Sequence, residues 1–196
     1  PIVIPTATRR LAACVMCAQM RRDMAEALQK IRQLGLGVPN GVEIAYRTVE
    51  QALAYMESDA GSDIDQFPVA LAYDLASAYN NVCRAQMISE ATDRHPQMVR
   101  FLNLLYGESG TLYFTAGGKV VESFGCHDGV LQGCPLGLHG LCFALWQFFQ
   151  DLADFVNQYS ASAAWICDDL TVVVPRVSLE PMLAFVEAEL PKYNMR

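Results

Sequence analysis

The first third of the chain alternates apolar and polar residues with the period of an α-helix. Between Thr8 and Arg32 the apolar side chains recur three or four positions apart, which predicts one long helix. The residues expected on its buried face are Leu11, Cys14, Val15, Ala18, Met24, Ala27, Leu28 and Ile31. The segment Gly35–Gly41, "GLGVPNG", interrupts the pattern, and a second helix is predicted from Val42 to Met56. The polar stretch "ESDAGSDIDQFP" then predicts a surface loop.

The middle of the chain changes from the helical pattern to that of strands and back. Residues 69–73, "VALAY", form a continuous apolar run that ends at Asp74, and such a run predicts a strand buried on both faces. Helical spacing returns over 81–92 and 96–106. The stretch "TLYFTAGGKVVESF" predicts a hairpin that turns at Gly117-Gly118, because tight turns need positive φ angles.

The last third contains a glycine-rich loop, a long helix and a second hairpin. "HDGVLQGCPLGLHG" predicts the loop, and the pattern after it predicts a helix over 136–156. Apolar residues flank Asp168 and Asp169 on both sides, which places the pair at the tip of a hairpin, and a final helix is predicted over 178–190. This order of elements predicts an α+β fold in which helices cover one face of an antiparallel sheet.

The three acidic residues next to these strands are the main candidates for chemistry. Asp168 and Asp169 can be simple turn residues, since aspartate is common in turns. If the strand that ends at Asp74 neighbours the hairpin, however, three carboxylates meet, which is costly without divalent cations. Oxygen ligands with no nearby histidine favour two Mg²⁺ or Mn²⁺ ions. Because side chains alternate along a strand, Asp168 is the predicted direct ligand and Asp169 the supporting one.

Composition indicates a globular protein without a membrane span. The chain has 196 residues, of which 53% are hydrophobic and 18% charged, enough for one domain with a full core. No apolar run reaches the roughly 18 residues that cross a bilayer. The chain opens at Pro1 without a methionine, so we expect it to be part of a longer protein.

Charge and cysteine content limit the possible functions. The net charge is −7, with three lysines and eleven arginines, and this weighs against a nucleic-acid binder. The seven cysteines lie mostly in apolar surroundings, which indicates buried thiols in a reducing compartment. Cys14 and Cys17 have the spacing of a zinc or redox pair, but no second pair follows and a structural zinc needs four ligands. The helical pattern instead predicts that both belong to the buried face.

Several motifs, taken in order, resemble those of reverse transcriptases. "YDLASAYNNV", "GVLQGCPLG" and "WICDDLTVVV" are similar to the three central palm motifs of that family, in the form found in non-LTR retrotransposons and group II introns. "PIVIPTATRRLA" and "QLGLGVPNGVEIA" resemble two finger motifs, and "FVEAELPKYNMR" resembles the helix after the catalytic hairpin. The resemblance covers nearly the whole chain. It implies partial helical fingers at 1–66 and a polymerase right-hand palm at 67–196, with the thumb absent.

The resemblance also implies a role for individual residues. Asp74, Asp168 and Asp169 would be the catalytic, metal-binding carboxylates, and Tyr79 would exclude a 2′-hydroxyl by its bulk. The other implied nucleotide-binding residues are Leu75, Gln132, Gly133, Arg9 and Arg10. Without the motifs, Tyr79 reads as a core aromatic, the glycine-rich loop as a connector, and the two arginines equally well as a solvated helix start. The implied partners are an RNA template with a DNA primer, dNTPs and the remainder of a retroelement polyprotein. The implied location is intracellular, and nuclear in a eukaryotic host.

Some positions depart from the family pattern and leave other functions open. Ile166 stands where an aromatic is usual, Cys134 where an acidic residue is frequent, and His139-Gly140 is unusual after "PLG". A basic residue that normally precedes "PI" lies outside this sequence. The alternative is therefore an inactive, reverse-transcriptase-like scaffold or degenerate copy that binds RNA or protein. An RNA-dependent RNA polymerase is disfavoured, because it would carry aspartate at position 79 and Ser-Gly at 132–133.

Overall fold

The computed structural model describes residues 5–195, which form two compact units. Within the described residues, unit 1 comprises 5–18 and 77–145, and unit 2 comprises 19–76 and 146–195. Each unit is therefore assembled from two separate stretches of the chain. The boundary between fingers and palm that the sequence suggests, at residues 66 and 67, falls inside unit 2.

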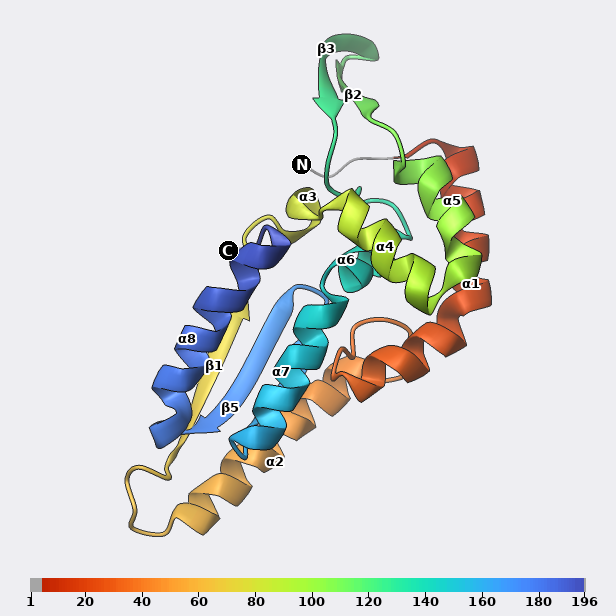
Figure 1. The fold of residues 1–196 in the computed structure, drawn as a ribbon. Helices are drawn as coiled ribbons and strands as arrows, with labels where there is room; N and C mark the ends of the chain where they lie inside the picture. Colours follow the sequence, from red (N-terminus) through yellow and green to blue (C-terminus); the bar gives the residue numbers. More distant parts are fainter. Residues whose placement is uncertain (1–4, 196) are drawn as a thin grey trace. The chain divides into compact units, whose positions relative to one another are not determined.

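Unit 2 is built around a three-stranded antiparallel sheet. The strands are β1 (Pro68–Asp74), β5 (Asp169–Pro175) and β4 (Ser162–Ile166), in the order β1-β5-β4. The helices of this unit are the second half of α1 (Ala7–Lys30), α2 (Gly41–Ala60), α7 (Trp146–Gln158) and α8 (Leu179–Glu189) (Figure 1). Short 3-10 helices, η1 (Arg176–Ser178) and η2 (Leu190–Tyr193), flank α8. The predicted first strand, acidic hairpin and final helix are thereby confirmed.

Helices cover both faces of this sheet, whereas the sequence predicted one covered face. Trp165 of β4 packs against α7, its ring centroid 4.5 Å from that of Phe149 and 5.4 Å from that of Phe148. Its neighbour Ala164 points to the opposite face and belongs to a buried cluster with Ala45 of α2. The prediction was wrong because α2, which precedes the first strand in the sequence, carries its own apolar stripe and packs against the second face.

The strand β1 is only half-buried, so the prediction of burial on both faces was also wrong. Ala70, Ala72 and Asp74 are exposed, while Leu71 and Tyr73 on the other face are partly buried. β1 is an edge strand, and α2 contacts β4 more extensively than β1. A continuous apolar run does not reveal this position, because alanine is tolerated on covered and open faces alike.

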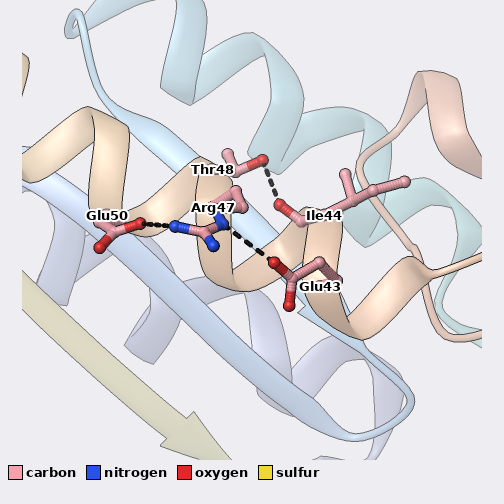
Figure 2. A network of polar contacts seen from close by, with 5 residues as sticks. All are labelled: Glu43, Ile44, Arg47, Thr48 and Glu50. Carbon is pink, nitrogen blue, oxygen red and sulfur yellow. Dashed lines mark hydrogen bonds and ion pairs between the residues drawn. The ribbon is translucent and has the colours of Figure 1, made fainter.

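The outer side of α2 carries a small polar network, drawn in Figure 2. The Arg47 guanidinium contacts Glu43 through Nε at 2.9 Å and Glu50 through Nη1 at 2.8 Å. The Thr48 hydroxyl donates to the Ile44 carbonyl at 2.8 Å. These pairs are exposed, so water screens them and they add little to stability. They nevertheless neutralise the positive charge of Arg47, which lies on the helix next to the sheet.

Unit 1 combines short helices with a projecting hairpin. Its helices are the first half of α1, then α3 (Ala78–Asn81), α4 (Arg84–Arg94), α5 (Pro96–Tyr106) and α6 (Gly137–Ala144). The hairpin pairs β2 (Gly110–Ala116) with β3 (Lys119–Cys126), and it stands out from the helices of its unit (Figure 1). Gly117 and Gly118 have φ angles of 57° and 74°, as the predicted turn requires. The hairpin exposes five large apolar residues: Tyr113, Phe114, Val120, Val121 and Phe124.

The helix predicted over 136–156 is two helices, α6 and α7, that meet at Leu145. Leu145 has φ −99° and ψ 8°, outside the helical range, and is fully buried. Nearly every residue of α6 is buried, whereas α7 has a polar side, so the apolar pattern changes character at the break. Neither glycine nor proline marks the break, which is why the sequence pattern did not reveal it. None of the helices in residues 5–195 combines the length and apolarity that a bilayer crossing requires.

The buried face of α1 differs from the predicted one over its first half. Leu11, Cys14, Val15 and Ala18 are exposed, so that part of the prediction was wrong. The buried residues are Ala13, Met20, Met24 and Leu28, a second stripe with the same three-to-four spacing. None of the seven cysteines forms a disulfide, and only Cys134 and Cys142 are buried, fewer than the sequence suggested.

His139 and Cys17 form a buried polar contact in unit 1. The Cys17 sulfur lies 3.7 Å from His139 Nδ1 and donates to the Pro135 carbonyl at 3.4 Å. His139 is 3% exposed, and burial lowers its pKa to about 4. Burial, together with the neighbouring Cys134 and Cys14, raises the pKa of Cys17 to about 11. Both groups are therefore neutral at pH 7, which favours a structural role over a reactive thiolate.

Acid is expected to destabilise the fold through His139. Its folded-state pKa of about 4 lies below the ordinary 6.5, so the stabilisation is complete above pH 6.5 and is lost as the pH falls to 4. The expected loss of unfolding free energy is about 3 kcal/mol, measurable by urea denaturation at pH 7 and pH 4. The variant His139→Gln should show a flatter pH dependence. Equal slopes in both proteins would contradict this role of His139.

Candidate active site

The sheet of unit 2 brings two of the candidate carboxylates into direct opposition. Asp74 is the last residue of β1, Asp169 is the first residue of β5, and the two are paired across the antiparallel ladder. Residues paired in this way have their side chains on the same face, with Cβ atoms about 5 Å apart. Both side chains are exposed. The condition on which the proposed cluster of carboxylates depended, that these strands are neighbours in the sheet, is therefore met.

Asp168 lies one position earlier, in the two-residue turn that joins β4 to β5. The amide of Leu75 donates to the Asp168 carbonyl at 3.4 Å, which ties the turn to the end of β1. Burial raises the pKa of the half-buried Asp168 carboxyl, and the charges of Asp169 and Asp74 raise it further. The register makes Asp169 the residue opposite Asp74. The assignment of Asp168 as the direct ligand and Asp169 as the supporting one stays a prediction.

The carboxylates at this edge are oxygen donors, the kind of ligand that a hard divalent cation prefers. Among residues 5–195, no three His, Cys, Asp or Glu side chains converge closely enough to hold a metal ion as the side chains stand. Mg²⁺, however, is commonly held by one or two carboxylates, with water and substrate phosphates completing its shell. The cross-strand pair Asp74 and Asp169, with Asp168 in the adjoining turn, supplies such oxygen donors. The charges of its neighbours, which raise the pKa of Asp168, are those that a bound cation would offset.

An apolar pocket of about 340 Å³ lies beside Asp169, between α2 and the sheet. Ile166, at the position where the family usually has an aromatic, lines it, as does the partly exposed ring of Tyr46. This pocket was not predicted from the sequence. The signal was present in the spacing of its α2 residues, which follow i, i+3, i+4 and i+7: Val42, Ala45, Tyr46 and Val49.

Tyr79 belongs to unit 1 and is held by the glycine-rich loop. It lies on the single turn α3, and its carbonyl accepts a hydrogen bond from the Val130 amide at 2.7 Å. Its half-buried ring lies close to Gly137, where an added Cβ would be 3.5 Å from Tyr79 Cε1. Leu75, by contrast, is buried in unit 2 next to Asp74. The role of Tyr79 as a gate stays a prediction.

The loop that carries Gln132 and Gly133 is anchored by Arg84. This buried side chain donates from Nε to the Gly129 carbonyl at 2.8 Å and from Nη1 to the Cys126 carbonyl at 3.2 Å. Gln132 is exposed and lines a cavity of about 270 Å³ along the loop. Sequence reasoning missed Arg84, because a lone arginine at a helix start gives no sign of burial.

The two arginines predicted for the phosphate side of the nucleotide differ in their surroundings. The Arg9 guanidinium lies 4.9 Å from the centroid of the Tyr106 ring and donates to the Leu105 carbonyl at 3.1 Å. Its Nε is buried without a hydrogen-bond partner in the described part of the chain. The side chain of Arg10 is exposed. Both belong to unit 1, together with Tyr79, Gln132 and Gly133, whereas the carboxylates and Leu75 belong to unit 2.

The acidic surplus of the chain is confined to unit 2. Its sequence holds sixteen Asp and Glu against eight Lys and Arg, whereas unit 1 holds five against six. The net charge of −7 therefore does not describe unit 1, which is close to neutral. The argument that the chain is too acidic to contact nucleic acid therefore applies to unit 2, which holds the carboxylates. It does not apply to unit 1, which holds Tyr79 and Gln132.

Comparison with protein-family models gave no match, and comparison with curated proteins gave none either. Three solved structures of telomerase, however, resemble the fold. Telomerase from Candida albicans, in complex with the TWJ fragment of telomeric RNA, matches with a TM-score of 0.60 and 11% identity, over 94% of this chain and 33% of that one. Apo telomerase from Candida tropicalis, truncated from its C-terminal domain, gives 0.56 and 12%, over 96% and 38%. The Candida tropicalis complex with the TWJ fragment gives 0.52 and 14%, over 91% and 31%.

This likeness shows the fold. The chain has a mixed α/β fold similar to that of telomerase, a polymerase related to reverse transcriptases, and the predicted reverse-transcriptase-like fold is confirmed at that level. It spans about a third of the length of these telomerase chains. The structures named here are neither non-LTR retrotransposon nor group II intron proteins, so that finer kinship stays a prediction.

Proposed function

We propose that this chain is the polymerase core of a reverse transcriptase, which adds deoxynucleotides to a primer 3′-hydroxyl under the direction of an RNA template. The observation that carries the proposal is the register of the sheet in unit 2, which pairs Asp74 with Asp169 and puts Asp168 in the adjoining turn. Carboxylates in such an arrangement, within a telomerase-like fold, suit phosphoryl transfer better than turn formation alone.

In the proposed reaction the primer oxygen attacks the α-phosphorus of a dNTP, and the bond to pyrophosphate breaks as the phosphodiester bond forms. Two Mg²⁺ or Mn²⁺ ions, when bound, would lower the pKa of the hydroxyl and neutralise the charge that develops on the leaving group. Asp74 and Asp168 would bind them, with Asp169 in support. Burial and the nearby carboxylates disfavour the charged form of Asp168, and this repulsion between carboxylates favours cation binding.

The residues of unit 1 would bind the nucleotide and the template. Tyr79 would lie under the incoming sugar and reject a 2′-hydroxyl by its bulk. Leu75, of unit 2, would also contact the nucleotide. Gln132 and Gly133 would contact the new base pair, and Arg9 and Arg10 would face the triphosphate. The motif order further supports an origin in a retroelement of the non-LTR or group II intron type, where the chain would belong to a larger polyprotein.

The direct test is extension of a labelled DNA primer on an RNA template with dNTPs and Mg²⁺ or Mn²⁺. We expect products that depend on the template, disappear when the ions are removed by EDTA, and form poorly with ribonucleotides. Primer without template is the matched control. A folded protein that binds the RNA but extends nothing under any of these conditions would favour the inactive scaffold.

A further inference from the structure

One buried side chain, that of Gln33, is hydrogen-bonded to the turn that carries Asp168. This glutamine is fully buried and lies in the segment between α1 and α2. Its amide Nε2 donates to the Cys167 carbonyl at 3.1 Å, and its Oε1 accepts from the Cys167 amide at 3.2 Å. The same oxygen also accepts from the Gly35 amide at 2.9 Å. The backbone carbonyl and the backbone amide of Cys167 are thus both bound by a single side chain, 134 positions away in the sequence.

The peptide that Gln33 binds has an unfavourable conformation. Cys167 has a φ angle of 57°, in the left-handed region that residues with a Cβ seldom adopt. Such a conformation persists when surrounding contacts over-determine it, and these sites are frequent where function requires them. Here the contacts are the glutamine amide and the indole of Trp165, whose Nε1 donates to the same Cys167 carbonyl at 2.7 Å.

The backbone around Gln33 is fitted equally closely to this turn. The Leu34 amide donates to the Trp165 carbonyl at 2.7 Å, and the Trp165 amide donates to the Arg32 carbonyl at 3.0 Å. An added Cβ on Gly35 would lie 2.6 Å from the Cys167 amide nitrogen, so only glycine fits there. The segment 32–35 is thus placed by its own backbone bonds, and the Gln33 side chain reaches the turn from a fixed position.

We propose that Gln33 is a positioning residue of the candidate active site, which sets the orientation of Asp168 by holding Cys167 in its left-handed conformation. The inference rests on the proposed polymerase function. Asp168 directly follows Cys167, so a change in the Cys167 peptide rotates the carboxylate that comes next. Displacements of about 1 Å at a reacting centre can cost a factor of 10² in rate. The telomerase-like fold supplies the sheet, and Gln33 sets the turn at its edge.

The test compares Gln33→Met, which keeps length and volume but loses both polar groups, with Gln29→Met, the same change at an exposed position of α1. Two quantities are measured on folded protein: kcat for primer extension, and the Kd for Mn²⁺ alone by electron paramagnetic resonance. In Gln33→Met we expect kcat to fall and the Mn²⁺ Kd to rise, each by about tenfold or more, with the dNTP KM changed little. Gln29→Met should match the parent in both.

A second substitution distinguishes positioning from simple stability. Glycine adopts positive φ without strain, so position 167 should keep its conformation without the Gln33 hydrogen bonds when Cys167 is replaced by glycine. The double variant Gln33→Met/Cys167→Gly should therefore regain, at least in part, the Mn²⁺ affinity that Gln33→Met loses. If Gln33→Met folds and leaves both kcat and the Mn²⁺ Kd within twofold of Gln29→Met, the proposal is wrong. If Gln33→Met does not fold and the double variant folds without Mn²⁺ binding, the proposal is equally wrong. Should the parent bind Mn²⁺ but extend no primer, the polymerase proposal fails while the effect of Gln33 on Mn²⁺ binding still decides this one.

Discussion

Replacing Asp168 by asparagine is expected to lower the rate of nucleotide addition by a factor on the order of 10³. The amide keeps the shape of the side chain but removes the negative charge that would hold a divalent cation. The backbone of the turn should be unaffected, because its hydrogen bonds to Leu75 and Gln33 run through main-chain atoms of Asp168 and Cys167. Stability should be retained or slightly raised, since the substitution relieves repulsion from Asp169 and Asp74.

Single-turnover primer extension, with urea denaturation of the same samples, measures both effects. Asp154→Asn is the matched control, because it removes one charge from an exposed position of α7 in the same unit. We expect the control to extend primers at the parental rate. Equal activity of Asp168→Asn and Asp154→Asn would show that the acidic hairpin is not a catalytic metal site, whatever reaction the fold supports.

Replacing Trp165 by alanine is expected to lower the free energy of unfolding by about 3–5 kcal/mol. Trp165 is 1% exposed and packs edge-on against Phe148 and Phe149, so truncation leaves a cavity in the centre of unit 2. It also removes the indole donor to the Cys167 carbonyl. The loss should therefore appear both in stability and in the conformation of the turn that carries Asp168.

Chemical denaturation measures the change in stability, and Tyr55→Ala provides the comparison. Tyr55 lies on α2 in the same unit but is 72% exposed, so its removal should alter the unfolding free energy by less than about 0.5 kcal/mol. A cost for Trp165→Ala as small as that for Tyr55→Ala would mean that the sheet and α7 do not share the core described above.

The sequence predicted the parts of the site whose signals are local. Asp168 and Asp169 interrupt an apolar run, and glycines mark the turn of the β2–β3 hairpin, so short-range patterns were enough. The pairing of Asp74 with Asp169 required one further inference, that the two strands are neighbours. Gln33 is the first residue of the segment "QLGLGVPNGVEIA", which resembles a finger motif. Nothing about its spacing indicates that its side chain binds Cys167, because the two residues are far apart in the sequence and meet only in the folded chain.

The sequence-based predictions were wrong where the same pattern of apolar residues is compatible with two different ways of packing. Along α1, the stripe with Cys14 and the stripe with Ala13 have the same helical spacing, and only the surrounding helices decide which is buried. The break at Leu145 has no glycine or proline, so it depends on packing that the local sequence does not encode. Ala70 and Ala72 are small enough for a covered or an open face, and the position of α2 leaves them open.

The interleaving of the two units has a consequence for synthesis of the protein. The chain passes from unit 1 to unit 2 near residue 18, returns near 77 and leaves again near 145, so neither unit is a contiguous segment that can fold as it emerges. β1 pairs with β5, from Pro68 with Pro175 to Asp74 with Asp169. β1 therefore cannot pair until about a hundred further residues have been synthesised. At about 5–20 residues per second, β1 stays unpaired for roughly 5–20 s. The strand edge that ends in Asp74 is therefore open to chaperones, or to wrong strand partners, until β5 has been synthesised.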